Sequence, residues 1–160
     1  MGLDMYLYGI KKNKKDDISE PSSGEWEEVC YWRKANAIHK WFNTKFIKEQ
    51  DPWGYYEVEE EDIQGLLLLC KLLKTLKENP NEIFQWVKTD FFEFVNNLDD
   101  GTIECADLIA RVLLPPDNLG CFFGSGMVDD WYWENIDDTI EQLTKALEGN
   151  YNKFFYMASW

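Results

Sequence analysis

The apolar residues of the stretch 28–48 recur at helical spacing, and this pattern constrains the fold more than any other feature of the chain. On a helical wheel its apolar stripe consists of Trp32, Ala35, Ile38, Phe42 and Phe46. The border of that stripe is polar and consists of Asn36, His39, Asn43, Arg33 and Lys40. The pattern predicts one amphipathic helix over about 28–48 that packs against the rest of the protein.

This border is rich in groups that bind anions. No acidic residue occurs between Lys34 and Lys48, although the whole chain has a formal net charge of −14. Guanidinium, ammonium, imidazole and amide groups bind phosphate or carboxylate oxygens, and an indole stacks on a planar ring. Two interpretations of His39 stay open: a structural group at the edge of the core, or a ligand contact. For Arg33 and Lys40 the alternative to a binding role is that their stems cover apolar surface.

Length and composition predict a single domain, 1–160. A chain of 160 residues can bury a sizeable core, and 16% aromatic residues are far too many for a disordered chain. Residues 1–50 carry nine basic and eight acidic residues, whereas residues 51–160 carry seven basic and twenty-two acidic ones. This acidity argues against direct binding to nucleic acid or to an anionic membrane. The acidic part either imitates nucleic acid towards a protein partner or serves solubility.

The cysteines give no sign of a metal site. None of the four cysteines forms a C-x-x-C pair, and the chain has one histidine, so no zinc signature exists and no cofactor is predicted. The first residues, MGLDMYLYG, lack the apolar core of a signal peptide. The apolar run 66–69 is too short to span a membrane. We therefore expect a cytoplasmic protein with reduced thiols.

Alternation and aromatic content predict strands at 2–10, 119–125 and the C-terminal tail, with a short strand at 55–58. In the first strand Leu3, Met5 and Leu7 share one face. We expect the C-terminal strand to pair antiparallel to 119–125 or to lie beside 2–10. These strands would form a small, mainly antiparallel sheet.

Further helices are predicted at about 60–78, 81–98, 103–114 and 131–148. The helix at 60–78 starts with acids and ends with lysines, as the helix dipole favours, and its leucine-rich middle predicts that it is the central buried helix. Asp129 or Asp130 would cap the last helix, and Gly149 would end it. The predicted fold class is therefore α+β, with four to five helices packed on the sheet.

Catalytic motifs are scarce, and no catalytic residue is assigned. The chain contains no G-x-x-x-x-G-K-S/T, G-x-G-x-x-G or G-x-S-x-G motif. The turn Gly124-Ser125-Gly126 either offers backbone amides to an anion or needs glycine for its conformation. The six carboxylates between 129 and 141 either bind a divalent metal or do acid–base work, or form a solvated face.

Four segments resemble a family of small acidic proteins encoded by tailed bacteriophages and prophages. These are MGLDMYLYG, EVCYWRKANAIHKWF, GCFFGS with the following WYWENIDDTIEQLTKAL, and FFYMASW. The resemblance implies a phage accessory protein that acts in the bacterial cytoplasm. Some family members carry a kinase name, which no motif of this chain supports. The recurring motif residues correspond to Tyr31, Trp32, Arg33, Lys34, Asn36, His39, Lys40, Trp41, Gly124, Ser125, Asp130, Trp131 and Trp160.

The favoured hypothesis is a protein that binds an anionic, nucleotide-like small molecule without turnover and so sequesters a signal of host defence. Its predicted ligand-binding residues are Trp32, Arg33, Asn36, His39, Lys40, Gly124, Ser125 and Trp131. A second hypothesis is an acidic inhibitor that binds a host nuclease or another defence protein. A third is a small hydrolase that uses His39 or a carboxylate pair. No feature of the sequence defines an oligomeric state.

Overall fold

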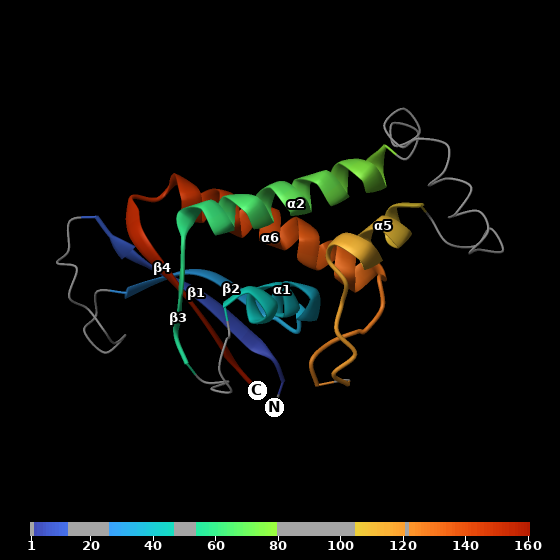
Figure 1. Cartoon of the computed structure of the whole chain (residues 1–160), viewed down its shortest axis with the longest axis horizontal. Helices are drawn as coiled ribbons and strands as arrows, with labels where there is room; N and C mark the ends of the chain where they lie inside the picture. The colour runs from blue at the N-terminus through green and yellow to red at the C-terminus, as the bar shows by residue number, and fades with distance from the viewer. Residues whose placement is uncertain (1, 13–25, 47–53, 80–104, 121) are drawn as a thin grey trace.

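The computed structural model describes residues 2–12, 26–46, 54–79, 105–120 and 122–160, and it has an α+β fold, as predicted (Figure 1). Along the chain its elements are β1 (Asp4–Lys11), β2 (Trp26–Arg33), α1 (Asn36–Phe46), β3 (Tyr56–Val58), α2 (Glu60–Glu78), α5 (Cys105–Leu113), α6 (Asp130–Glu148) and β4 (Tyr151–Ser159). The four strands form one antiparallel sheet in the order β2-β1-β4-β3. The helix predicted over 81–98 lies outside the described residues.

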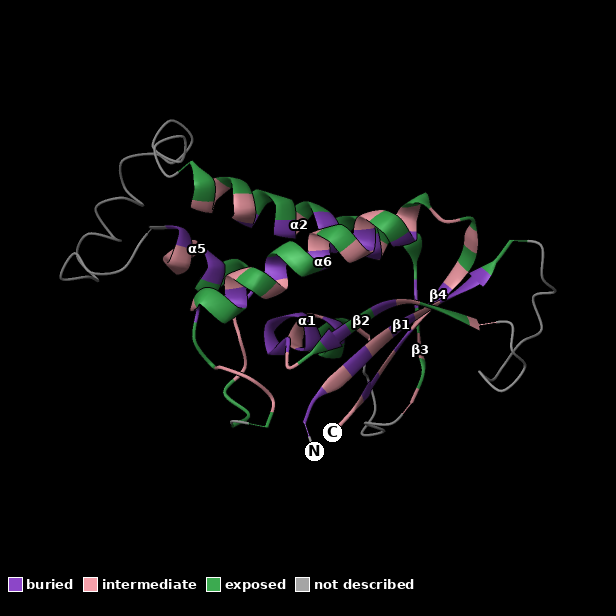
Figure 2. Ribbon diagram, turned by 180° about the vertical axis from the view of Figure 1, so that it is seen from behind, coloured by how far each residue is buried: buried purple, intermediate pink, exposed green. Residues whose placement is uncertain are grey.

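Strict alternation along β1 divides the sheet into a core face and an open face. Leu3, Met5 and Leu7 are fully buried, as predicted, and the residues between them are half-buried, which Figure 2 shows as alternating purple and pink. In register with Leu7 lie Cys30 on β2 and Tyr156 on β4, both buried. The C-terminal tail forms β4 and pairs with β1, which confirms one of the two predicted pairings. The short strand β3 is confirmed as well.

The predicted helix over 28–48 is wrong in its first third, because residues 26–33 form the strand β2. Cys30 and Trp32 are buried while Tyr31 and Arg33 are exposed, an alternation with the period of a strand. Aromatic and β-branched residues favour an extended backbone, and pairing with β1 decides the conformation. Lys34, with φ 56°, turns the chain, and α1 begins only at Asn36.

The predicted strand over 119–125 is also wrong. Gly120 and Gly124 have φ values of 93° and 108°, which a β-strand does not allow, and this stretch forms turns. A single hydrogen bond, from Leu3 N to Phe122 O at 3.1 Å, joins it to the residue before β1. Its glycines and aromatic residues thus build a connection between α5 and α6 that touches the sheet without extending it.

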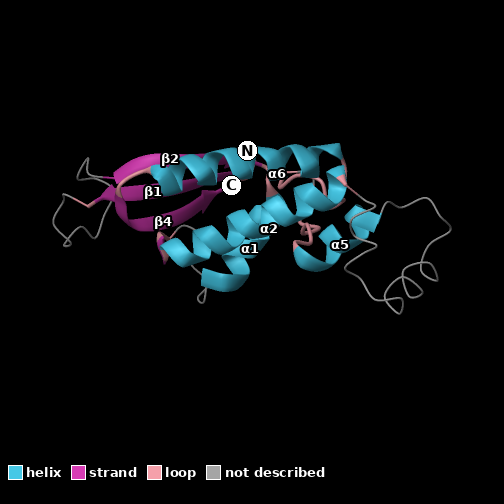
Figure 3. Ribbon diagram, turned by 90° about the horizontal axis from the view of Figure 1, so that it is seen from above, coloured by secondary structure: helices cyan, strands magenta, loops and turns pink. Residues whose placement is uncertain are grey.

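The helices pack on the core face, and α2 runs alongside α6 (Figure 3). The bounds of α2 agree with the prediction, but its central burial does not. Ile63, Leu66 and Leu73 are fully buried, whereas Leu68 and Leu72 are 70% and 46% exposed. A run of leucines covers the whole circumference of a helix, yet among the described elements α2 packs mainly against α6 and α5. No helix in the described ranges combines the length and the apolar character needed to cross a bilayer.

Side-chain hydrogen bonds fasten α6 to the edge strand β2. The indole Nε1 of Trp32 donates to Thr139 Oγ1 at 3.0 Å in the core. At the surface, Gln142 accepts from Tyr31 N at 2.6 Å and donates to Tyr31 O at 2.8 Å. Gln142 therefore occupies the backbone groups of Tyr31 that another strand would need for pairing.

Candidate functional site

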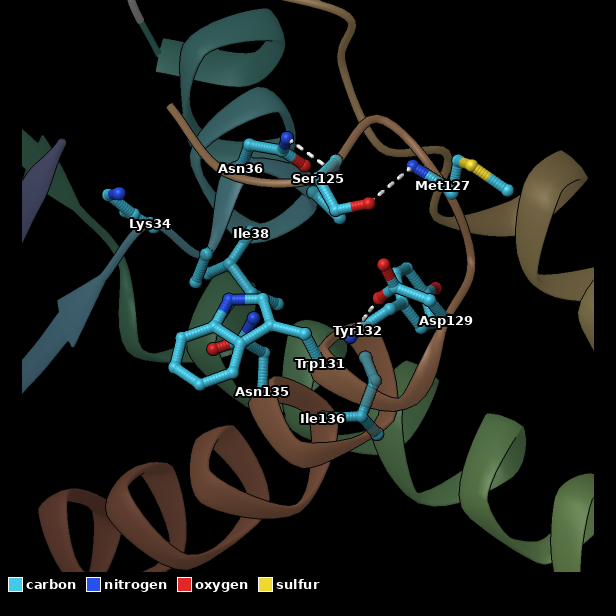
Figure 4. A pocket seen from close by; sticks show the side chains of 12 residues that line it. Lys34, Asn36, Ile38, Ser125, Met127, Asp129, Trp131, Tyr132, Asn135 and Ile136 are labelled. Atoms are coloured by element: carbon cyan, nitrogen blue, oxygen red, sulfur yellow. Dashed lines mark hydrogen bonds between the residues drawn. The ribbon is translucent and has the colours of Figure 1, made fainter. Parts of the chain in front are cut away.

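The first turns of α1 and α6 enclose a narrow hollow, which we call the α1 pocket (Figure 4). Its lining residues are Lys34, Ala35, Asn36, Ala37, Ile38, Ser125, Met127, Asp129, Trp131, Tyr132, Asn135 and Ile136. The cavity between them measures about 10 Å³, which is room for about one water molecule. Three of the predicted site residues, Asn36, Ser125 and Trp131, meet here.

The walls of the α1 pocket hold the chain between α5 and α6 against the start of α1. Asn36 is 4% exposed, and its amide nitrogen donates to Asp117 O at 3.0 Å and to Ser125 O at 2.7 Å. The hydroxyl of Ser125 accepts from Met127 N at 3.2 Å. Both amide hydrogens of Asn36 are therefore donated to backbone oxygens, and the residue links the start of α1 to the segment between α5 and α6.

Position 124 needs glycine because the backbone of Lys34 approaches it closely. A Cβ atom at this position would lie 2.3 Å from the carbonyl oxygen of Lys34, and its φ of 108° is one that L-residues rarely adopt. Gly124 thus fits against the left-handed turn at Lys34 and does not line the pocket. This contact supports the conformational interpretation of the glycine-rich turn over the anion-binding one.

The electrostatics of the α1 pocket are mixed. Ala35 cannot cap α1 with its side chain, so the amides of the first turn present the positive end of the helix dipole. On the opposite wall the carboxylate of Asp129 caps α6 by accepting from Tyr132 N at 3.0 Å. The side chain of Lys34 runs past Gly2, away from the middle of the pocket. A pocket of about 10 Å³ with this mixed lining does not form a ligand site, although the indole of Trp131 in its wall is 47% exposed.

His39 lies in the core and not at a ligand site. It is 3% exposed, its Nδ1 is 2.7 Å from Tyr156 Oη, and its ring makes an edge contact with Trp160 at 5.7 Å. Burial lowers the pKa of His39 to about 4, while the charge of Asp117 acts in the opposite direction. The imidazole is neutral at pH 7, and the structural interpretation of this residue is the one that the geometry supports.

The other predicted cations and Trp32 lie apart from one another. Trp32 is 1% exposed beneath α6, where it cannot touch a ligand in the α1 pocket. Arg33 ends β2 opposite Asp4. Lys40 projects from α1 towards Asp117, with 3.8 Å between Nζ and Oδ1. The predicted cluster is therefore divided. Five of its members were placed on one helical wheel, but Trp32 and Arg33 belong to β2 and not to α1.

A second and wider hollow lies along α1, and we call it the Trp41 groove. Its lining residues are Ala37, Lys40, Trp41, Thr44, Lys45, Leu113, Leu114 and Pro115. It measures about 510 Å³, which is within the usual range of small-molecule sites. Lys45 Nζ lies 4.9 Å from the centroid of the Trp41 ring, a cation–π distance. Lys40 is the predicted site residue that lines it.

Both lysines of the groove form ion pairs at its edge. Lys40 pairs with Asp117, and Lys45 pairs with Asp62 at the start of α2. The predicted site did not include Trp41 or Lys45. The i, i+4 pairs Lys40/Thr44 and Trp41/Lys45 share one face of α1, so their spacing was the signal that could have identified this face.

Thiol and metal chemistry finds no support in the described residues. Cys30 and Cys70 are buried, and burial raises the pKa of both thiols. No group of three or more His, Cys, Asp or Glu residues in the described ranges could hold a metal ion. On α6, Asp137 binds Lys74 and Glu141 binds Lys145, so these acids have cations of their own.

Comparison of the chain with protein-family models, with curated proteins and with solved structures found no match. The chemistry of the two hollows therefore carries the functional argument.

Proposed function

We propose that this chain is a phage-type accessory protein that binds a small anionic ligand with a planar ring, such as a nucleotide, in the Trp41 groove and does not turn it over. The observation that carries the proposal is a groove of about 510 Å³ that is lined by Trp41, Lys40 and Lys45, with the Lys45 ammonium 4.9 Å from the indole centroid. Leu114 and Pro115 supply an apolar wall. A ring that stacks on Trp41 would place its anionic substituent between Lys40 and Lys45.

The existing ion pairs of these lysines do not prevent anion binding. The side chains of Lys40 and Asp117 are 36% and 34% exposed, and those of Lys45 and Asp62 are 46% and 22% exposed. Solvent-exposed ion pairs of this kind contribute about 0–1 kcal/mol. A phosphate that meets both lysines forms charge-assisted hydrogen bonds with more acceptor oxygens than a single carboxylate offers. Exchange of carboxylate for phosphate is therefore inexpensive in free energy.

The absence of turnover in this proposal is supported by the residues around the groove. None of its lining residues is a histidine, a cysteine or a carboxylate. The hydrolase hypothesis relied on His39, which is buried and hydrogen-bonded to Tyr156. A protein that holds a nucleotide and leaves it intact suits sequestration of a defence signal in the bacterial cytoplasm, the compartment in which the family resemblance implies that an accessory protein acts.

Isothermal titration against a panel of linear and cyclic nucleotides tests the proposal. We expect at least one of them to bind, and we expect Trp41→Leu and the double change Lys40→Gln/Lys45→Gln each to weaken binding at least tenfold. Lys71→Gln, an exposed lysine on α2, is the matched control and should leave binding unchanged. No heat from any nucleotide with a folded protein would contradict the proposal.

The alternative function is that of an acidic inhibitor. A nucleic-acid mimic presents carboxylates to a basic partner, and on α6 Asp137 and Glu141 form solvent-exposed ion pairs with lysines of this chain, which contribute little to stability and can be exchanged. Pulldown from a bacterial lysate at low and high salt separates the two functions, because an inhibitor complex of that kind weakens steeply with ionic strength.

A further inference from the structure

The open face of the sheet carries a continuous layer of aromatic side chains, which we call the aromatic face. It consists of Tyr6, Tyr8, Trp26, Tyr31, Tyr55 and Phe155. Tyr6 and Tyr8 alternate along β1 with the buried Met5 and Leu7, which fixes the tyrosines on the side away from the helices. No described helix covers this face.

The rings contact one another across β2, β1 and β4, and Tyr55 joins them from the position before β3. Trp26 stacks on Phe155 with 4.3 Å between ring centroids, and Tyr8 lies 6.0 Å from both Trp26 and Tyr6. At the margins Tyr31 and Tyr55 are 39% and 40% exposed. Aromatic residues are enriched at protein interfaces. An exposed aromatic patch of this kind therefore indicates an interaction surface.

Two carboxylates lie among the rings, Glu28 on β2 and Asp4 at the start of β1. Glu28 is in register with Tyr8, and Asp4 accepts a hydrogen bond from Tyr31 Oη at 2.6 Å. The pKa of Tyr6 is raised by burial and by the charges of Asp4 and Glu28. The basic residues lie at the borders: Lys11 pairs with Glu27 at 2.8 Å, Lys153 pairs with Glu57 at 3.2 Å, and Arg33 lies opposite Asp4.

The combination of aromatic rings and carboxylates disfavours the binding of single-stranded nucleic acid, although bases stack well on aromatic rings. Binding of nucleic acid depends on cations that neutralise phosphates, and here carboxylates lie between the rings in a chain of net charge −14. The same surface favours the binding of a cation. The faces of Tyr and Trp attract ammonium and guanidinium groups, and Asp4 and Glu28 add charge-assisted hydrogen bonds.

We propose that the aromatic face docks an extended segment of a partner protein that presents arginine or lysine at alternate positions. In an extended chain every second side chain points the same way, at a repeat of about 6.6 Å. Tyr6 and Tyr8 are two positions apart on β1, and their ring centroids are 6.0 Å apart, close to this repeat. Tyr31 and Trp26 flank these two rings from β2. A segment that runs along β1 therefore brings two alternate basic side chains onto Tyr6 and Tyr8.

Fluorescence anisotropy with a fluorescein-labelled peptide of five Gly-Arg repeats tests the proposal. We expect Tyr31→Leu and Glu28→Gln each to weaken binding at least fivefold, and Tyr31→Phe, which keeps the ring, to retain it. Glu134→Gln on α6 is the matched control for general attraction to an acidic protein and should have no effect. Equal weakening by the control, tighter binding of a fifteen-nucleotide uridine strand, or no binding of the peptide would each overturn the proposal.

The indole N–H of Trp26 gives a second readout that charge alone does not move. Its Nε1 is buried and has no hydrogen-bond partner among the described residues. The NMR signal of this N–H, assigned with Trp26→Phe, should shift on addition of the peptide. Trp41→Leu should leave this shift unchanged, because the Trp41 groove lies on the other side of the sheet. A shift that depends on Trp41, or no shift at saturation, would contradict docking on the aromatic face.

Discussion

At the scale of single residues, His39 shows how position in the fold decides between two chemistries that the sequence left open. As a polar residue at the border of an apolar stripe, it suited both a ligand site and the core. The hydroxyl of Tyr156 from β4, at 2.7 Å, supplies the partner that makes burial of the imidazole tolerable. That partner is 117 positions away in the sequence. No local pattern could have identified it.

The depressed pKa of His39 predicts a pH dependence of stability. The unfolded chain binds a proton at His39 near pH 6.5, whereas the folded protein does so near pH 4. The contribution of neutral His39 to the free energy of unfolding is therefore fully present above pH 6.5. It is lost as the pH falls to 4, by an amount on the order of 3 kcal/mol. Urea denaturation at several pH values should show that His39→Gln loses less stability than the wild type over this window. Parallel curves for the two proteins would contradict the prediction.

Gly124→Ala and Gly120→Ala are a matched pair of substitutions that measure how much stability is lost when a side chain is added at a positive φ. Both have positive φ, but a Cβ at Gly124 meets the Lys34 carbonyl at 2.3 Å, whereas nothing lies within 4 Å of a Cβ at Gly120. We expect Gly120→Ala to cost about 1 kcal/mol from backbone strain, and Gly124→Ala to cost at least 2–3 kcal/mol more because the loop must move. Thermal unfolding of both variants measures this difference, and equal losses would show that the close approach is unimportant.

At the scale of elements, the sequence predicted α2, α6, β1 and β4 well and misjudged β2 and 119–125. In α6 the acidic start, the apolar spacing and Gly149 agree with one another, so local and tertiary preferences coincide. In 26–33 they conflict. Cys30 and Trp32 satisfy a strand through pairing with Leu7 and Met5, and those partners become visible only when β1 is in place. The same error misplaced the predicted site, because Arg33 is the last residue of β2 and does not lie on α1.

The structure assigns the cap of α6 to Asp129, which predicts different costs for two neighbouring acids. Asp129 accepts from Tyr132 N at 3.0 Å, whereas Asp130 is the first residue of the helix. We expect Asp129→Ala to lower the free energy of unfolding by about 1 kcal/mol. Asp130→Ala should cost only a few tenths of that from the helix dipole. Chemical denaturation of both variants measures the order, and the reverse order would contradict the assigned cap.

At the scale of the whole molecule, one hydrophobic core joins the sheet to the helices, and the two surfaces that we propose for binding lie on opposite sides of it. Residues of β1, β2, α1, α2, α6 and β4 belong to the same cluster, which includes Cys30 from the sheet and Cys70 from α2. The Trp41 groove uses the helical side and the aromatic face uses the other side of the sheet. The sequence predicted the acidic, aromatic and α+β character of the chain but not these surfaces, because each is assembled from elements far apart in the chain.

If this core opens as one unit, its two thiols should become reactive together. Cys30 and Cys70 are 2% and 0% exposed, and burial raises the pKa of both, so neither thiolate is available in the folded protein. In a Cys105→Ser/Cys121→Ser variant, labelling with a disulfide reagent would then proceed only through global opening, with the same free energy for both cysteines. Labelling followed by peptide mass spectrometry at rising urea concentrations measures each site. Faster labelling of Cys70 than of Cys30 would mean that α2 detaches on its own and that the chain is not a single cooperative domain.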